Sequence, residues 1–113
     1  VHSWPLSIKP FYIMPKTLDP KEKVSKGFDA LYGGIEISSG GQRIHLPELL
    51  TERLKAKKLN PKDFKYYIDS MKFGAPNHSG WSIGLERFTM TLLGFDNIRE
   101  TTLFPRDRDR LIP

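Results

Sequence analysis

The segment from Gly80 to Phe88 has the residue types and spacing of a turn that binds an anionic ligand. Gly80 and Gly84 allow the backbone to lie close to a planar base or a phosphate, because glycine has no Cβ. Arg87 follows in the first turn of an expected helix, where its planar, permanently charged guanidinium can donate two hydrogen bonds to a phosphate. Glycine turns followed by an arginine are common, so this segment alone is a weak indication of anion binding.

Further polar residues lie in the strand-like segment 34–45. Ile35 and Ile37 alternate with Glu36, so the carboxylate points to the opposite face of a strand from the two isoleucines. A lone glutamate in this position is usually the solvent-facing residue of a half-buried strand. Arg43 has a similar structural alternative as a surface cation, and His78 as a solvated loop residue.

Short elements position these residues. Three apolar or aromatic segments predict strands, at 8–14, 28–32 and 34–38. Pro10 places the first at a sheet edge, because proline cannot donate a hydrogen bond to a ladder. The lysine-rich residues 15–26 predict an exposed, mobile loop. Gly40-Gly41 predicts a break or bulge before the last strand resumes at 42–45.

Three helices are expected after residue 45. Their apolar stripes are Leu46, Leu49, Leu50 and Leu54; Phe64, Tyr67, Ile68 and Met71; and Leu85, Phe88, Thr89, Leu92 and Leu93. Asn60 and Pro61 open the second helix as cap and first residue. Gly74 ends the second, and the third runs from about Leu85 to Leu93 with Gly94 as its stop. The order strand, strand, strand, helix, helix, glycine-rich turn, helix predicts an α+β fold, an antiparallel sheet flanked by helices.

Length and composition indicate a single globular domain over residues 1–113. The absence of cysteine excludes disulfides and thiolate zinc sites and is compatible with a cytoplasmic location. No apolar run reaches the roughly 20 residues that span a bilayer, and no signal-peptide pattern opens the chain, so no membrane association is expected. The net charge of +5 is compatible with a nucleic acid partner, although lysines on helix faces usually form a solvated surface.

Several blocks together resemble the class II aminoacyl-tRNA synthetases. Gly80–Phe88 resembles their third signature motif, a strand, a glycine turn and a helix with a fixed arginine. The blocks that resemble the aspartyl and asparaginyl subgroup, in its order, are Ile8–Tyr12, Gly34–Gly40, Gln42–His45 and Asn97–Glu100. The ending Leu103–Pro113 resembles archaeal-type aspartyl-tRNA synthetases. The resemblance covers nearly the whole chain and implies the C-terminal half of a class II catalytic domain of the aspartyl type.

The resemblance implies roles for individual residues. Glu36 and Ser39 match the pair that holds Mg²⁺ at the phosphates of ATP, and both offer the hard oxygen ligands that this ion prefers. Arg43 matches the arginine that reads the side-chain carboxylate of aspartate in bidentate geometry. Arg87 matches the catalytic arginine that binds ATP, and Gly84 belongs to the same ATP-binding turn. Secondary candidates for the amino-acid site are Gln42, His45 and His78.

The chain also departs from the family pattern. The family has glycine where Ser82 stands and Pro-His-Gly at residues 77–79, which indicates relaxed constraint on ATP binding. Its first and second motifs and its anticodon-binding barrel have no counterpart here. The second motif supplies the arginine that binds the α-phosphate of ATP, where negative charge develops during activation. Loss of such a stabilising group costs about 10²–10³-fold in rate.

Two functional interpretations follow. In the first, the chain is a truncated synthetase homologue or a cut fragment with half of an ATP and aspartate site, which binds these ligands weakly and does not activate aspartate alone. In the second, it is a non-catalytic module for binding or assembly with protein or RNA. An asparagine-making relative is less favoured, because amide synthesis through an adenylate needs the same α-phosphate machinery. The sequence gives no specific expectation of tRNA binding.

A partial sheet should expose strand edges and an apolar face, and both favour association. We therefore expect a homodimer or higher oligomer, or a complex with another chain. Light scattering after size-exclusion chromatography at micromolar concentration checks this expectation. A monodisperse monomer would contradict it.

Overall fold

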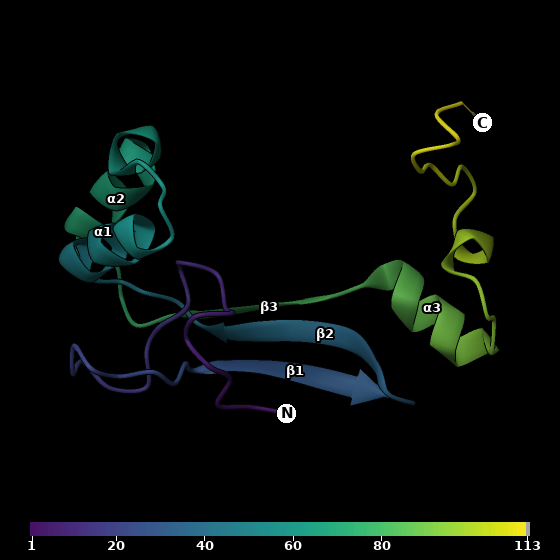
Figure 1. Cartoon of the computed structure of the whole chain (residues 1–113), viewed down its shortest axis with the longest axis horizontal. Coiled ribbons are helices and arrows are strands. Elements are labelled where there is room, and N and C mark those ends of the chain that lie inside the picture. Colours follow the sequence, from purple (N-terminus) through teal and green to yellow (C-terminus); the bar gives the residue numbers. More distant parts are fainter. Residues whose placement is uncertain (113) are drawn as a thin grey trace. The chain divides into compact units, whose positions relative to one another are not determined.

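The computed structural model describes residues 1–112, which form two compact units. The first contains Val1–Phe28 and Gly40–Trp81, and the second contains Asp29–Ser39 with the residues from Ser82 onward. In chain order the elements are β1 (Gly27–Tyr32), β2 (Ile35–Gln42), α1 (Pro47–Ala56), the 3-10 helix η1 (Pro61–Phe64), α2 (Lys65–Lys72), β3 (Ser79–Ile83), α3 (Leu85–Leu93) and the 3-10 helix η2 (Ile98–Thr101) (Figure 1). The predicted α+β class is confirmed.

The three strands form an antiparallel sheet, as predicted, and their order is β1-β2-β3. Gly33 and Gly34 join β1 to β2 with φ angles of +57° and +81°, a left-handed conformation that glycine adopts without strain. Between β2 and β3, the backbone N–H of Gly84 donates to the carbonyl of Ile37 at 2.9 Å. Immediately beyond Gln42, the N–H of Arg43 donates to the carbonyl of His78 at 2.9 Å.

The predicted strand at residues 8–14 is wrong. Ile8 and Ile13 donate in turns to the carbonyls of Pro5 and Pro10, whereas the Met14 amide donates to the Gln42 carbonyl at 2.9 Å. The segment keeps only an isolated antiparallel bridge between Ile13 and Arg43. Proline offers no N–H for a ladder and favours turns at these positions, which shortens the extended stretch below the length of a strand. The third strand of the sheet is β3, after the helices, where the element order had placed only a glycine-rich turn.

Of the predicted break or bulge at Gly40-Gly41, the break is wrong, because β2 continues through both glycines. A Cβ at Gly40 would lie 2.6 Å from the Cβ of Trp81 and 2.8 Å from the carbonyl oxygen of Gly80. A Cβ at Gly41 would lie 2.8 Å from the carbonyl oxygen of Lys26. These glycines therefore permit close approach of neighbouring backbones, the alternative use of glycine inside a strand.

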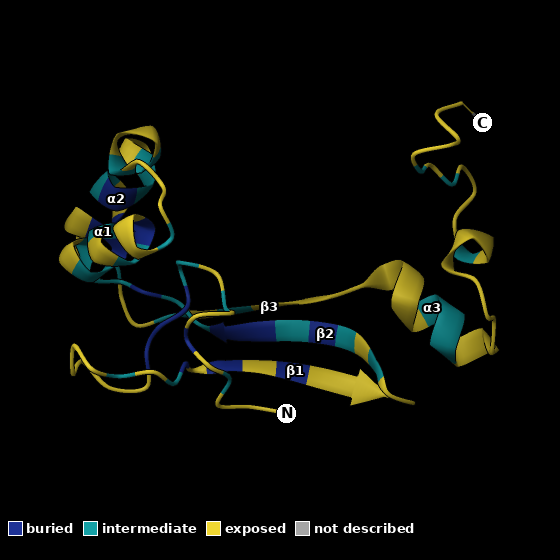
Figure 2. Ribbon diagram, viewed as in Figure 1, coloured by how far each residue is buried: buried dark blue, intermediate teal, exposed yellow. Residues whose placement is uncertain are grey.

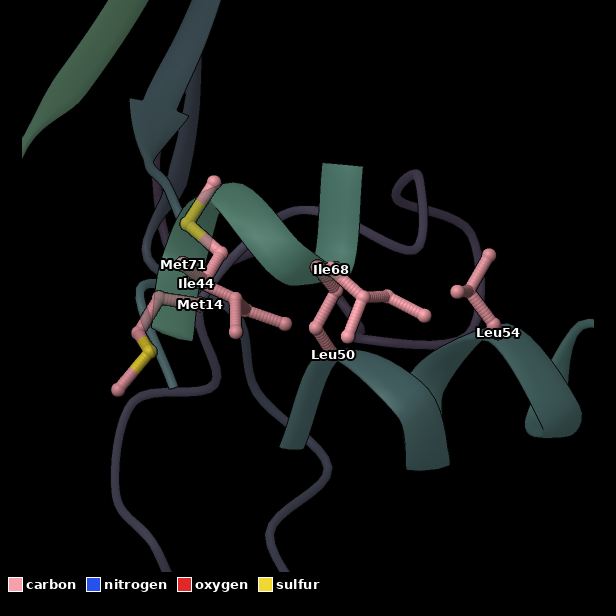
Figure 3. Close-up of a cluster of buried hydrophobic side chains, with 6 residues drawn as sticks. All are labelled: Met14, Ile44, Leu50, Leu54, Ile68 and Met71. Carbon is pink, nitrogen blue, oxygen red and sulfur yellow. The ribbon is translucent and has the colours of Figure 1, made fainter. Parts of the chain in front are cut away.

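The apolar stripes of α1 and α2 form the core of the first unit, as predicted. The buried cluster consists of Met14, Ile44, Leu50, Leu54, Ile68 and Met71 (Figure 3). Asn60 caps a helix as expected, accepting a hydrogen bond from the amide of Lys62, but it opens η1, and α2 begins at Lys65. Residues 16–23, in the predicted loop, are almost all exposed.

In the second unit, α3 has the predicted bounds and ends at Gly94 with a φ of +72°. This helix contains no buried residue, and most of it is exposed in Figure 2. Leu85 and Leu92 on its apolar stripe are 69% and 67% exposed. The stripe is therefore an apolar surface in this unit. Among residues 1–112 there is no helix with the length and apolarity needed to cross a bilayer.

Leu50→Ala should destabilise the first unit by about 2–5 kcal/mol, because the Leu50 side chain is fully buried and its truncation leaves a cavity. Urea denaturation followed by circular dichroism measures this change. Leu92→Ala is the matched control, a helical leucine exposed to solvent, and should change the free energy of unfolding by about 0.5 kcal/mol or less. Equal effects of the two substitutions would contradict this description of the core.

Candidate functional site

Four of the predicted site residues come together in the second unit. Glu36 and Ser39 lie on β2, whereas Gly84 and Arg87 lie at the start of α3. All four line one hollow, together with Ile37, Ser38, Ser82, Glu86 and Ile98. The hydrogen bond from the Gly84 amide to the Ile37 carbonyl joins the start of α3 to β2. Arg87, three residues further on, is thereby placed beside Glu36.

The Arg87 guanidinium contacts Glu36 in two ways. Nη1 donates to the Glu36 backbone carbonyl at 3.2 Å and lies 3.6 Å from the carboxylate oxygen Oε1. The side chains are 50% and 45% exposed, so water screens their ion pair and its attraction is weak. The contact orients the guanidinium while leaving donors free for an incoming anion, since arginine has five N–H donors.

Ser39 donates a hydrogen bond of 2.6 Å from its hydroxyl to the carboxylate of Asp29, a buried residue of β1. Asp29 was absent from the predicted site. The alternation of β1 could have indicated it, because Asp29 faces inward between the exposed Phe28 and Ala30. Nearby, the Ser38 hydroxyl donates to the Ser82 carbonyl at 2.8 Å, which adds a side-chain link between β2 and β3.

The oxygen donors of this hollow fit a magnesium ion that arrives with a nucleotide. Glu36 offers a carboxylate and Ser39 a hydroxyl, both hard ligands. Within residues 1–112 there is no group of three or more His, Cys, Asp and Glu residues arranged to hold a metal. Mg²⁺ is usually bound through one or two carboxylates with phosphate and water oxygens completing its shell, so a dedicated protein cage is not required.

In the first unit, Gln42, His45 and His78 line a separate hollow, which also includes Lys26 and Asn77. The Gln42 side-chain amide donates to the Asn77 side-chain oxygen at 3.3 Å. His78 Nδ1 lies 2.9 Å from the Pro76 carbonyl oxygen, the distance of an N–H donor. His45 Nδ1 is buried and has no hydrogen-bond partner within residues 1–112. This orphaned nitrogen is available to a polar ligand or a water molecule.

Arg43 lies outside this lining. Its guanidinium carbon is 4.6 Å from the centre of the Tyr12 ring, a cation–π arrangement. No ion pair within residues 1–112 includes Arg43, in contrast to Arg87. Tyr12 was not predicted as a site residue, although it belongs to the block Ile8–Tyr12 that resembles the aspartyl and asparaginyl subgroup.

Comparison with known proteins decides the family. The model of tRNA synthetases class II (D, K and N) matches residues 1–108. The chain belongs to this family.

The similar proteins include aspartate–tRNA ligases and structures of aspartyl- and asparaginyl-tRNA synthetases. The aspartate–tRNA(Asp) ligase of Thermoplasma acidophilum is 53% identical over all 113 residues, which cover 26% of that protein. The structure of an Entamoeba histolytica aspartyl tRNA synthetase matches with a TM-score of 0.90 at 49% identity, over 99% of this chain and 23% of the other. The Pyrococcus horikoshii asparaginyl-tRNA synthetase also matches with a TM-score of 0.90, at 36% identity, over 100% of this chain and 27% of the other.

These comparisons confirm the resemblance to archaeal aspartyl-tRNA synthetases. They also confirm the fold class, an antiparallel sheet with helices as in the aspartyl and asparaginyl enzymes. The chain spans about a quarter of the length of the relatives that it matches. The roles of individual site residues remain predictions.

Arg87→Ala and Glu36→Gln should each change the free energy of unfolding by less than about 1 kcal/mol, because their ion pair is exposed. Urea denaturation of both variants against the unsubstituted chain measures the change. A loss of several kcal/mol for either variant would show that the pair has a structural function.

Proposed function

We propose that this chain forms the part of an aspartate–tRNA ligase that binds the terminal phosphates of ATP and the side chain of aspartate. The complete ligase would activate aspartate with ATP and transfer it to tRNA. The observation that carries the proposal is the grouping of Arg87, Glu36, Ser39 and Gly84 around one hollow. Similarity to aspartate–tRNA ligases over the whole chain supports the choice of substrate.

The second unit would bind the nucleotide. Arg87 directs a weakly paired guanidinium to the hollow, where it can donate to the oxygens of a terminal phosphate. Glu36 and Ser39 would hold Mg²⁺. When bound, this ion would neutralise part of the negative charge of the phosphates. The backbone near Gly84 leaves room for a ligand, since even a Cβ there would have no neighbour closer than 3.7 Å.

The first unit would bind the amino acid. Arg43 carries a positive charge that no carboxylate within residues 1–112 neutralises, and a substrate carboxylate would complete the pair. A guanidinium and a carboxylate meet in bidentate geometry, which discriminates aspartate from its neutral amide. Gln42, His45 and His78 offer further polar groups around their own hollow.

We expect this chain to bind ATP without activating aspartate. Activation of the carboxylate requires stabilisation of charge on the α-phosphate, for which the family uses its second motif. No segment within residues 1–112 resembles that motif. We therefore expect this chain alone to bind ATP weakly and to show no aspartate-dependent exchange of pyrophosphate into ATP.

Calorimetric titration with Mg-ATP tests the nucleotide site. Saturable binding is expected, and Arg87→Ala should weaken it about tenfold or more, because hydrogen bonds to charged groups contribute about 1.5–3 kcal/mol. The matched control is Arg108→Ala, an exposed arginine of the same unit outside the hollow. Absence of binding at millimolar ATP, in a chain shown to be folded, would overturn the proposal.

A second candidate function is a non-catalytic module that assembles with a protein partner. The exposed apolar stripe of α3 favours it, because large uncovered apolar surfaces usually mark interfaces. This candidate predicts that the chain associates with a protein partner. It also predicts that Arg87→Ala leaves ligand binding unchanged.

A further inference from the structure

We infer that Tyr12 and Gly80 form a slot that fixes the plane of the Arg43 guanidinium before any carboxylate binds. Tyr12 and Gly80 are thus positioning residues, which act on a ligand through Arg43. The inference rests on the proposed function for the identity of the ligand, aspartate. The slot itself is a property of the first unit and can be tested without a ligand.

Tyr12 provides one wall of the slot. The guanidinium carbon of Arg43 lies 4.6 Å from the centre of its ring, within the range of a favourable cation–π contact. Arginine stacks flat on aromatic faces in a way that lysine cannot, because its charged group is planar.

Gly80 provides the other close contact. A Cβ at this position would lie 3.0 Å from Nε, 3.0 Å from Nη2 and 3.4 Å from Cζ of Arg43. Three atoms of one guanidinium at such similar distances show that the group runs alongside the Gly80 backbone. A side chain at this position would require the guanidinium to shift by a few tenths of an ångström, and glycine leaves it in place.

The backbone holds both walls in register with Arg43. Ile13 and Arg43 form an antiparallel bridge, and the amide of Ile44 donates to the Tyr12 carbonyl at 2.9 Å. On the other side, the Arg43 amide donates to the carbonyl of His78, two residues before Gly80. The three components of the slot are therefore placed by main-chain hydrogen bonds on both sides of Arg43.

Aromatic packing connects the Tyr12 wall to the core. The rings of Phe11 and Tyr12 meet edge to face with centroids 5.3 Å apart, and Phe11 meets Phe64 in the same way at 5.1 Å. Phe11 and Phe64 pack against the buried cluster. Tyr12 is therefore connected through Phe11 and Phe64 to the packed core of the first unit, which can hold its ring in place beside Arg43.

Among residues 1–112, no carboxylate pairs with the charge that the slot holds. Arg43 forms no ion pair within residues 1–112. Tyr67, which interacts electrostatically with both Arg43 and Tyr12, stays neutral because burial raises the pKa of its hydroxyl. A guanidinium that is fixed in plane but unpaired is preorganised for a carboxylate, because little side-chain freedom is lost on binding.

Nuclear magnetic resonance of the ¹⁵N-labelled chain without ligand tests the slot directly. The Arg43 Nε–H signal, assigned by its absence in Arg43→Lys, should show the shift caused by the Tyr12 ring and slow exchange with water. Tyr12→Phe should retain both properties, and Tyr12→Leu should remove them. Tyr66→Leu, which truncates an exposed tyrosine, is the matched control and should leave the signal unchanged. A signal typical of a mobile, solvated arginine in the unsubstituted chain would overturn the inference, whether or not the variants fold.

Titration with L-aspartate, with L-asparagine as the comparison ligand, connects the slot to function. Tyr12→Leu and Gly80→Ala should each weaken aspartate binding about tenfold, whereas Tyr12→Phe should stay within about threefold of the unsubstituted chain. Equal aspartate affinity in Tyr12→Leu and the unsubstituted chain would overturn the inference. If aspartate does not bind while the Arg43 signal is that of a fixed group, the slot is supported and the proposed function of Arg43 fails.

Discussion

Close main-chain packing along β2 is the constraint on which the site depends. At Gly40 and Gly41 the neighbouring backbone and side chains come so near that a Cβ would overlap with them. Main-chain hydrogen bonds continue on both sides of these glycines, and they set which residues stand opposite one another. Because side chains alternate along a strand, a register shift of one residue would turn every β2 side chain to the other face. The positions of the polar groups on β2, Glu36 and Ser39 among them, therefore follow from this packing.

The two arginines illustrate different ways of presenting a positive charge. Arg87 is exposed and touches Glu36 only weakly, so its orientation comes from the carbonyl that it contacts and from the start of α3. Arg43 is half-buried and has an aromatic ring beside it in place of a carboxylate. A paired arginine must exchange one partner for another when an anion binds. An unpaired arginine gains a partner without losing one.

The sequence predicted the helices better than the strands. The bounds of α3 and the core stripes of α1 and α2 were correct, because helical periodicity and terminal glycines are local signals. The strand at 8–14 was wrong because the amides of Ile8 and Ile13 donate to proline carbonyls in turns, and proline has no amide for a ladder. A break at Gly40-Gly41 was wrong because these glycines allow neighbouring backbone to approach closely while β2 continues, and no local pattern shows this approach.

The sequence by itself determined the family, since its blocks of glycine and charged residues are specific in combination. It also determined which polar residues were candidates for the site. Only the tertiary structure decided how they group: Glu36, Ser39, Gly84 and Arg87 line one hollow, and Arg43 stacks on Tyr12. It likewise revealed the bond between Ser39 and the buried Asp29. The physical reason is that these contacts join residues from different elements, and their distances depend on strand register and packing, which no local pattern encodes.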